Sequence, residues 1–293
     1  MRFVTTPLSR RGWLAGAAAA LAAPRVWAAD GRRVVSVGGA LTETLYALGA
    51  QAELVGVDTT SLYPEAARQL PSVGYARALS AEGVLSLRPT LVVATAEAGP
   101  PAVLRQIEAA RVPLVLLDAD HRFEGLLART QRLADLCGRA EAGRSLVGEL
   151  QQSWARTREQ LARHAAAGRP PLRVLFVLSH SMAQVRVSGS GTAADAMIRY
   201  AGGVNALGGF EGYKPLTPEA AIATAPDVLL ATEQGLQADG GIDGLLKAPG
   251  LAQTPAGRAR RVVAQDALLM LGFGPRLPQA VAALAEALHG KLA

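Results

Sequence analysis

The chain contains only one cysteine, Cys137, among its 293 residues. It therefore forms no intrachain disulfide, and its stability must come from an apolar core. Half of the residues are hydrophobic, which is enough for one large domain or two smaller ones. Cys137 ends the segment RLADLC, and we interpret it as a small buried side chain on a helix.

Aromatic residues and histidines are also scarce, since Phe, Trp and Tyr make up 4% of the chain and there are four histidines. The sequence contains no G-x-S-x-G, no H-E-x-x-H and no P-loop lysine motif. Residues 188–192, SGSGT, offer two interpretations, an anion cradle or a turn into a helix N-cap, and we favour the N-cap. We expect the chain not to be an enzyme.

The positive charge of the chain is concentrated at its beginning. Removing residues 1–28 takes away four arginines and no acidic residue, which lowers the formal net charge from +6 to +2. The remaining chain has no basic tail and no block of Lys and Arg. These features argue against a nucleic-acid partner.

Residues 1–29 have the pattern of a secretory signal peptide, with a basic start, an apolar run and small residues at the end. The apolar run, Trp13–Ala23, is too short to be a permanent membrane span. Arg10 and Arg11 resemble the twin-arginine pattern, which would mean export after folding. Both this route and the ordinary secretory route stay open, and either predicts an exported protein.

Short apolar strands alternate with helices in two parts of the mature chain, which predicts α/β lobes with mainly parallel sheets. We place the first lobe at 30–122 and the second at 169–293. The expected strands are 33–37, 54–57, 91–94, 112–117, 173–178, 185–187, 228–231 and 261–263.

The linker between these lobes, 123–168, is expected to be helical. It has no strand-like run, and its apolar residues recur at three- and four-residue steps. We predict one helix to about Cys137, a break near Gly138, and a second helix over 141–164, about 36 Å long. A helix of this length suits a strut between two lobes.

The two lobes share a sequence repeat. EGVLSLRPTLVVAT, which begins at Glu82, aligns without gaps to EAAIATAPDVLLAT, which begins at Glu219. Each segment predicts a helix with Glu in its first turn, a stop at Pro89 or Pro226, and a buried strand. The repeat either reflects the helix–proline–strand order that is common in alternating α/β units, or it indicates two related lobes. If the lobes are related, Glu82 and Glu219 lie at matching positions, one in each lobe. Two acidic residues placed in this way suggest docking on a basic partner.

The segment VGYARAL, residues 73–79, places Tyr75 and Arg77 two positions apart. In an extended stretch their side chains point to the same side of the chain. The pair is compatible with a surface hydrogen bond or with a site that holds a phenolate, and the pattern does not choose between them.

Several longer segments together resemble the periplasmic haem-binding proteins of bacterial haem ABC importers. They are VVSVGGALTETLYALG, LVGVDTTSLYP, LPSVGYARALSAEGVLSLRPTLVVAT and LSHSMAQVRVSGSGTAADAMIRYAGGVNA. The wider group includes vitamin B12 and siderophore binding proteins. The resemblance implies two Rossmann-like lobes joined by a long helix, and a monomer that carries haem b in the cleft between them. The alternative is the same fold with a ferric siderophore or a corrinoid.

The resemblance also implies roles for individual residues. Gly74-Tyr75-Ala76-Arg77 matches the motif in which Tyr is the axial ligand of the haem iron and the basic residue steadies its phenolate. Tyr63, in SLYP, is the rival ligand and a candidate lining residue. His180 is the candidate haem contact from the opposite lobe, with Met182 beside it.

Other residues are candidates for contacts with the haem propionates or with the permease. Arg186, Tyr213 and Lys214 are candidates to meet the propionates, whereas we set aside the other histidines: His121, at the junction of lobe and linker, His164 and His289. In the wider family one Glu per lobe docks into arginine-lined pockets on the dimeric permease of the inner membrane. The matching positions are the two glutamates that open the repeat, Glu82 and Glu219.

Overall fold

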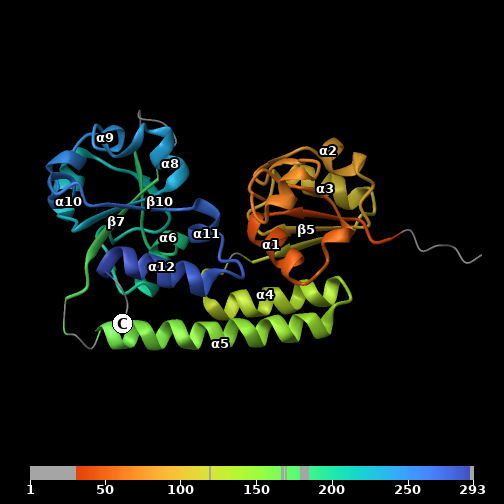
Figure 1. The fold of residues 1–293 in the computed structure, drawn as a ribbon. Coiled ribbons are helices and arrows are strands. Elements are labelled where there is room, and N and C mark those ends of the chain that lie inside the picture. The colour runs from red at the N-terminus through yellow and green to blue at the C-terminus, as the bar shows by residue number, and fades with distance from the viewer. Residues whose placement is uncertain (1–30, 119, 166–167, 169, 179–184, 291–293) are drawn as a thin grey trace, which may run out of the picture. The chain divides into compact units, whose positions relative to one another are not determined.

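The computed structural model describes residues 31–118, 120–165, 168, 170–178 and 185–290 (Figure 1). The expected signal peptide, 1–29, lies outside the described residues, and so do His180 and Met182. The chain from Arg33 onward falls into one compact unit.

The first lobe is built on a parallel sheet whose strands lie in the order β2-β1-β5-β6. Successive side chains of β1 enter different cores, with Val34 in one hydrophobic cluster and Val35 in another. Both faces of the sheet are therefore covered, which explains its unbroken apolar strands. The elements are β1 (Val34–Val37), α1 (Gly39–Ala47), β2 (Leu54–Val57), β3 (Gly74–Tyr75), β4 (Ala78–Leu79), α2 (Ala81–Ser86), β5 (Leu91–Thr95), α3 (Pro101–Ala109) and β6 (Leu114–Leu117), with short 3₁₀ helices at Gln51–Glu53 and Glu65–Gln69.

The second lobe has a mixed sheet in the order β10-β8-β7-β11-β12, and β9 also pairs with β7. β7, β11 and β12 are parallel, whereas β8 is antiparallel to both of its neighbours, β7 and β10. Its elements are β7 (Arg173–Leu178), β8 (Arg186–Ser188), α6 (Ala193–Tyr200), β9 (Val204–Asn205), β10 (Tyr213–Pro215), α7 (Pro218–Thr224), β11 (Val228–Thr232), α8 (Glu233–Ala238), α9 (Gly241–Leu245), a 3₁₀ helix (Leu251–Gln253), α10 (Pro255–Arg258), β12 (Val262–Gln265), α11 (Ala267–Leu271) and α12 (Leu277–His289). Thr192 caps α6, so the predicted N-cap is confirmed.

Two helices that lie side by side, α4 (Phe123–Leu136) and α5 (Ala140–Ala165), link the lobes (Figure 1). The break between them falls at Gly138, whose φ of 65° suits glycine at a helix end. α5 has 26 residues and is therefore about 39 Å long. Its ends differ from the predicted ones by one residue each, and the predicted fold class is confirmed.

The helix pair contributes side chains to the cores of both lobes. Leu133 of α4 belongs to the cluster of β1, and Leu150 and Trp154 of α5 belong to the cluster of β7 and β11. Within the described part of the chain, none of the helices combines the length and the apolar character that a membrane span needs.

The sequence repeat is also a structural repeat. Ser80 and Thr217 accept hydrogen bonds as N-caps of α2 and α7. The residue before each proline, Arg88 or Ala225, has a positive φ, 47° and 41°. Each unit then continues into a central strand, β5 or β11. The common helix–proline–strand order of α/β proteins does not require these matching N-caps and turns. They therefore favour two related lobes.

A partly buried ion pair joins the two lobes. Glu43 of α1, 5% exposed, accepts hydrogen bonds of 2.9 Å from Nε and Nη2 of Arg276, which precedes α12. The guanidinium of Arg276 also lies 3.6 Å from the ring centroid of Tyr63. A cation held by a carboxylate on one side and a ring on the other fixes the separation of these segments.

We expect Glu43→Gln to lower the free energy of unfolding by about 2–4 kcal/mol, because it leaves Arg276 without its counter-ion. Urea unfolding at pH 7 measures this change. The matched control is Glu141→Gln, which removes an exposed pair with Arg144 and should cost less than about 1 kcal/mol. Equal effects of the two substitutions would contradict the structural importance of the buried pair.

Candidate ligand-binding pocket

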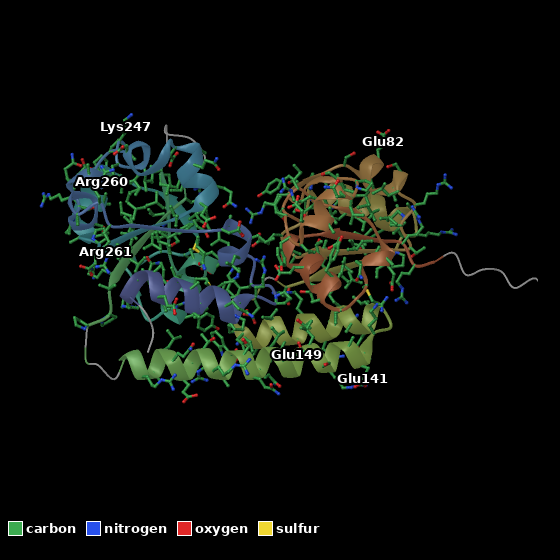
Figure 2. The ribbon with its side chains drawn as sticks, viewed as in Figure 1. Glu82, Glu141, Glu149, Lys247, Arg260 and Arg261 are labelled. Atoms are coloured by element: carbon green, nitrogen blue, oxygen red, sulfur yellow. The ribbon has the colours of Figure 1, made fainter. Side chains whose placement is uncertain are left out.

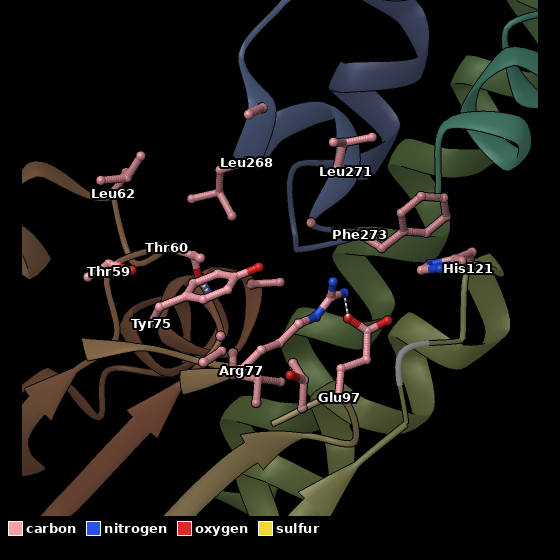
Figure 3. Close-up of a pocket in the computed structure, with 18 of the residues that line it drawn as sticks. Thr59, Thr60, Leu62, Tyr75, Arg77, Glu97, His121, Leu268, Leu271 and Phe273 are labelled. Carbon is pink, nitrogen blue, oxygen red and sulfur yellow. Dashed lines mark hydrogen bonds and ion pairs between the residues drawn. The ribbon is translucent and has the colours of Figure 1, made fainter. Parts of the chain in front are cut away.

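A pocket of about 420 Å³ lies at the carboxyl ends of β1, β2 and β5 (Figure 3). β2 and β5 flank β1, so the pocket sits at the switch point where parallel sheets commonly bind ligands. The second lobe closes it with α11 and the loop that follows. The lining residues are Gly38, Gly39, Ala40, Leu41, Thr59, Thr60, Leu62, Tyr75, Ala76, Arg77, Thr95, Glu97, His121, Arg129, Ala267, Leu268, Leu271, Gly272 and Phe273.

The glycine pair after β1 lets the rim loops approach each other closely. A Cβ on Gly39 would lie 2.3 Å from the carbonyl oxygen of Thr60, so only glycine fits there. The backbone N–H of Gly39 donates to Oγ1 of Thr60, and that of Gly38 donates to Asp58, each at 2.9 Å. These bonds hold the loops after β1 and β2 as one wall of the pocket.

Tyr75 and Arg77 lie on a tight hairpin between β3 and β4, in which Tyr75 pairs with Ala78. Arg77 is therefore in the turn and not in an extended stretch, which corrects the geometry assumed from the sequence. Both side chains still point into the pocket (Figure 3). The Tyr75 side chain remains open to a ligand, since the residue is 47% exposed.

Arg77 forms an ion pair with Glu97, which follows β5 (Figure 3). The hydrogen bond that Arg77 donates to Glu97 is the main cause of the raised pKa of Arg77, and the nearby Tyr75 contributes less. Glu97 was missed in the sequence because no motif surrounds it. The guanidinium thus has a carboxylate partner in the pocket besides the neighbouring phenol.

His121, which the sequence analysis set aside, lies between β6 and α4 and lines the pocket. Its ring packs 5.2 Å from that of Phe273, and neither ring nitrogen has a hydrogen-bond partner among the described residues. Burial lowers the pKa of His121, Glu97 opposes the shift and Arg129 adds to it. A neutral imidazole at this position can donate to or accept from a bound ligand.

Arg129 of α4 is another lining residue that sequence reasoning missed, and it is only 7% exposed. It donates to the carbonyl oxygen of Asp118 at 3.0 Å and to that of Phe273 at 2.6 Å. The side chain therefore links the end of β6 with the loop after α11. Burial lowers the pKa of its guanidinium.

Other candidates lie outside the pocket lining. Tyr63 packs under Arg276, and Arg186 donates to the carbonyl oxygen of Tyr213 at 2.7 Å. Lys214 lies over the ring of Phe210. Among the other histidines set aside, His289 lies 3.1 Å from the carbonyl oxygen of Ala201 and His164 belongs to α5.

The glutamates of the repeat are exposed in the first turns of α2 and α7. Figure 2 shows the side chain of Glu82 extending away from its lobe. Glu219 occupies the matching place in the other lobe, one residue after the N-terminal Pro218 of α7. Neither side chain forms an ion pair with a described residue, so both carboxylates are available to a partner.

The family profile described as "periplasmic binding protein" matches residues 34–268. The chain belongs to the periplasmic binding protein family. It is similar to the solved periplasmic heme-binding protein BhuT in complex with two hemes, with a TM-score of 0.84 and 51% identity over 89% of this chain and 99% of that one. It is also similar to apo RhuT from Roseiflexus sp. RS-1, with a TM-score of 0.84 and 43% identity over 88% and 98% of the two chains.

The chain is also similar to a protein that binds another ligand, the vitamin B12-binding protein of Pectobacterium atrosepticum. It is 30% identical over 145 residues, which are 50% of this chain and 52% of that protein. The match thus spans about half the length of this relative.

We expect this periplasmic binding protein to lose stability as the pH falls below about 6.5, partly through His121. Its pKa is lowered by burial, so the unfolded chain takes up this proton first. The stabilisation is present above pH 6.5 and is lost as the pH falls towards the lowered pKa. Unfolding midpoints from pH 8 to 5 should fall less steeply for His121→Phe than for the wild type. Parallel curves would contradict this assignment.

Proposed function

We propose that this periplasmic binding protein binds haem in the pocket between its lobes and delivers it to an ABC importer. The observation that carries the proposal is the accessible phenol of Tyr75, with Arg77 beside it, in a pocket lined mainly by apolar side chains. The similarity to the heme-binding proteins BhuT and RhuT over nearly 90% of the chain supports it.

The chemistry of the pocket suits a ferric porphyrin. Tyr75 supplies a phenolate oxygen as axial ligand, a hard donor that matches ferric iron. The guanidinium of Arg77 stabilises the negative charge on that oxygen. Leu62, Leu268 and Leu271 offer apolar contacts to the face of a large ring. Haem b is thus a transported ligand held by one iron–oxygen bond and by burial, and no reaction of the ligand is required.

The alternative ligand is a corrinoid or a ferric siderophore. The vitamin B12-binding relative favours the corrinoid, but its match covers only half of this chain. The heme-binding structures match a larger share of the chain at higher identity. Haem is therefore the better supported ligand.

We propose further that the protein acts as a periplasmic monomer that docks on the permease dimer through Glu82 and Glu219. Their equivalent places in the two lobes suit a partner with two related halves and basic docking pockets. The lobes themselves are proposed to extend over 30–122 and 169–293, with the linker at 123–168.

Absorption spectroscopy with hemin tests the ligand and Tyr75 together. Hemin bound to the wild type should give a Soret band that is shifted from that of free hemin, and a high-spin ferric phenolate spectrum. Tyr75→Ala should lose the phenolate features, because the iron loses its oxygen donor. Tyr63→Phe is the matched control and should keep them, since this ring packs under Arg276. An unchanged spectrum in Tyr75→Ala would place the iron on another residue.

The docking role predicts a loss of transport without a loss of binding. Glu82→Gln combined with Glu219→Gln should lower hemin uptake through the reconstituted importer by about tenfold or more, because two charged contacts are lost. The hemin affinity of this variant should equal that of the wild type. Glu141→Gln, an exposed glutamate on α5 (Figure 2), is the matched control and should transport normally. Normal uptake by the double variant would rule out this docking mode.

A further inference from the structure

One cation in the pocket has no carboxylate partner. The guanidinium of Arg129 is bonded only to two main-chain carbonyl oxygens, those of Asp118 and Phe273, within the described chain. These two bonds use two of the five N–H groups of an arginine side chain. Arg129 is 7% exposed and lines the pocket, and three of its N–H groups have no hydrogen-bond partner among the described residues.

Two carboxylates at this end of the pocket, Asp120 and Glu97, are already engaged by other arginines. Asp120 accepts three hydrogen bonds of 2.6–2.9 Å from Arg122. Glu97 is paired with Arg77. Asp120 only opposes the lowering of the pKa of Arg129 that burial causes. A buried cation without an ion-pair partner is unfavourable, so an anion bound at Arg129 would be stabilised.

His121 provides a second polar group at the same end of the pocket. Its ring packs against Phe273, whose carbonyl oxygen accepts the bond from Arg129. The free ring nitrogens of His121 include one N–H donor in the neutral form. Figure 3 shows Tyr75 and His121 on opposite sides of the Arg77–Glu97 pair. The phenol and this cationic end therefore meet different parts of one large ligand.

We propose that Arg129 and His121 form a carboxylate-binding subsite, and that it takes a propionate of haem. The inference rests on the proposed haem-binding function. The iron stands at the centre of the porphyrin and the carboxylates on its edge, so Tyr75 and this subsite together define how the ring is oriented. The propionate carboxylate forms an ion pair with Arg129 and accepts a further hydrogen bond from His121.

The test compares hemin with hemin dimethyl ester, in which both carboxylates are blocked. Arg129 also bridges two segments of the fold, so the variant used is His121→Phe, which keeps the aromatic contact with Phe273. The wild type should bind hemin at least about tenfold more tightly than the ester. His121→Phe should weaken the binding of hemin severalfold and leave that of the ester unchanged.

Two controls identify the cause of any change. Leu268→Ala removes an apolar lining contact that both ligands share, so it should weaken both by the same factor. Iron-free protoporphyrin IX keeps the carboxylates, and His121→Phe should weaken it as it weakens hemin. An effect on hemin but not on protoporphyrin IX would make His121 an iron ligand and overturn the inference.

Equal affinity of the wild type for hemin and its ester would also overturn the inference, while leaving the proposed function intact. Failure of the wild type to bind hemin at all would instead contradict the proposed function, and the subsite with it. Binding titrations followed at the Soret band separate these results.

Discussion

The packing of α4 and α5 into the cores of both lobes is the constraint on which the pocket depends. Leu133 of α4 is buried with the first sheet, and Trp154 of α5 is buried with the second. A bend in either helix would expose apolar surface in at least one core, at about 25 cal/mol for each Å². The helix pair therefore resists large changes in lobe spacing, and the ion pair between Glu43 and Arg276 restrains the same spacing.

Much of the fold could be predicted because its signals are local. Unbroken apolar runs identified the central parallel strands, and three- and four-residue spacing placed α5 to within one residue at each end. The antiparallel pairing of β8 with β10 was harder to predict from the sequence. It joins residues 186–188 to residues 213–215 and is set by tertiary contacts. Glu97, His121 and Arg129 escaped prediction for the same reason, because residues distant in sequence bring them to one pocket.

The arginines around the pocket differ in their partners, and the difference assigns their roles. Arg276 has a buried carboxylate and a ring, so its charge is satisfied within the fold. Arg77 has Glu97 and a neighbouring phenol, so it can share its charge with a ligand bound at Tyr75. Arg129 has only main-chain carbonyl oxygens as hydrogen-bond partners among the described residues, and it forms no ion pair with any of their carboxylates. An anionic group of the ligand is therefore most favourable at Arg129.

The choice between Tyr63 and Tyr75 shows what sequence and exposure alone leave undecided. Tyr63 lies in a loop of the first lobe and Tyr75 in the short strand β3, but they are 44% and 47% exposed, so accessibility does not distinguish them. The surroundings of the two side chains distinguish them. The face of the Tyr63 ring is occupied by Arg276, which is itself held by Glu43. Tyr75 lines the pocket beside a guanidinium that can stabilise a phenolate. Of the two phenols, Tyr75 is thus the one whose surroundings favour an iron–oxygen bond.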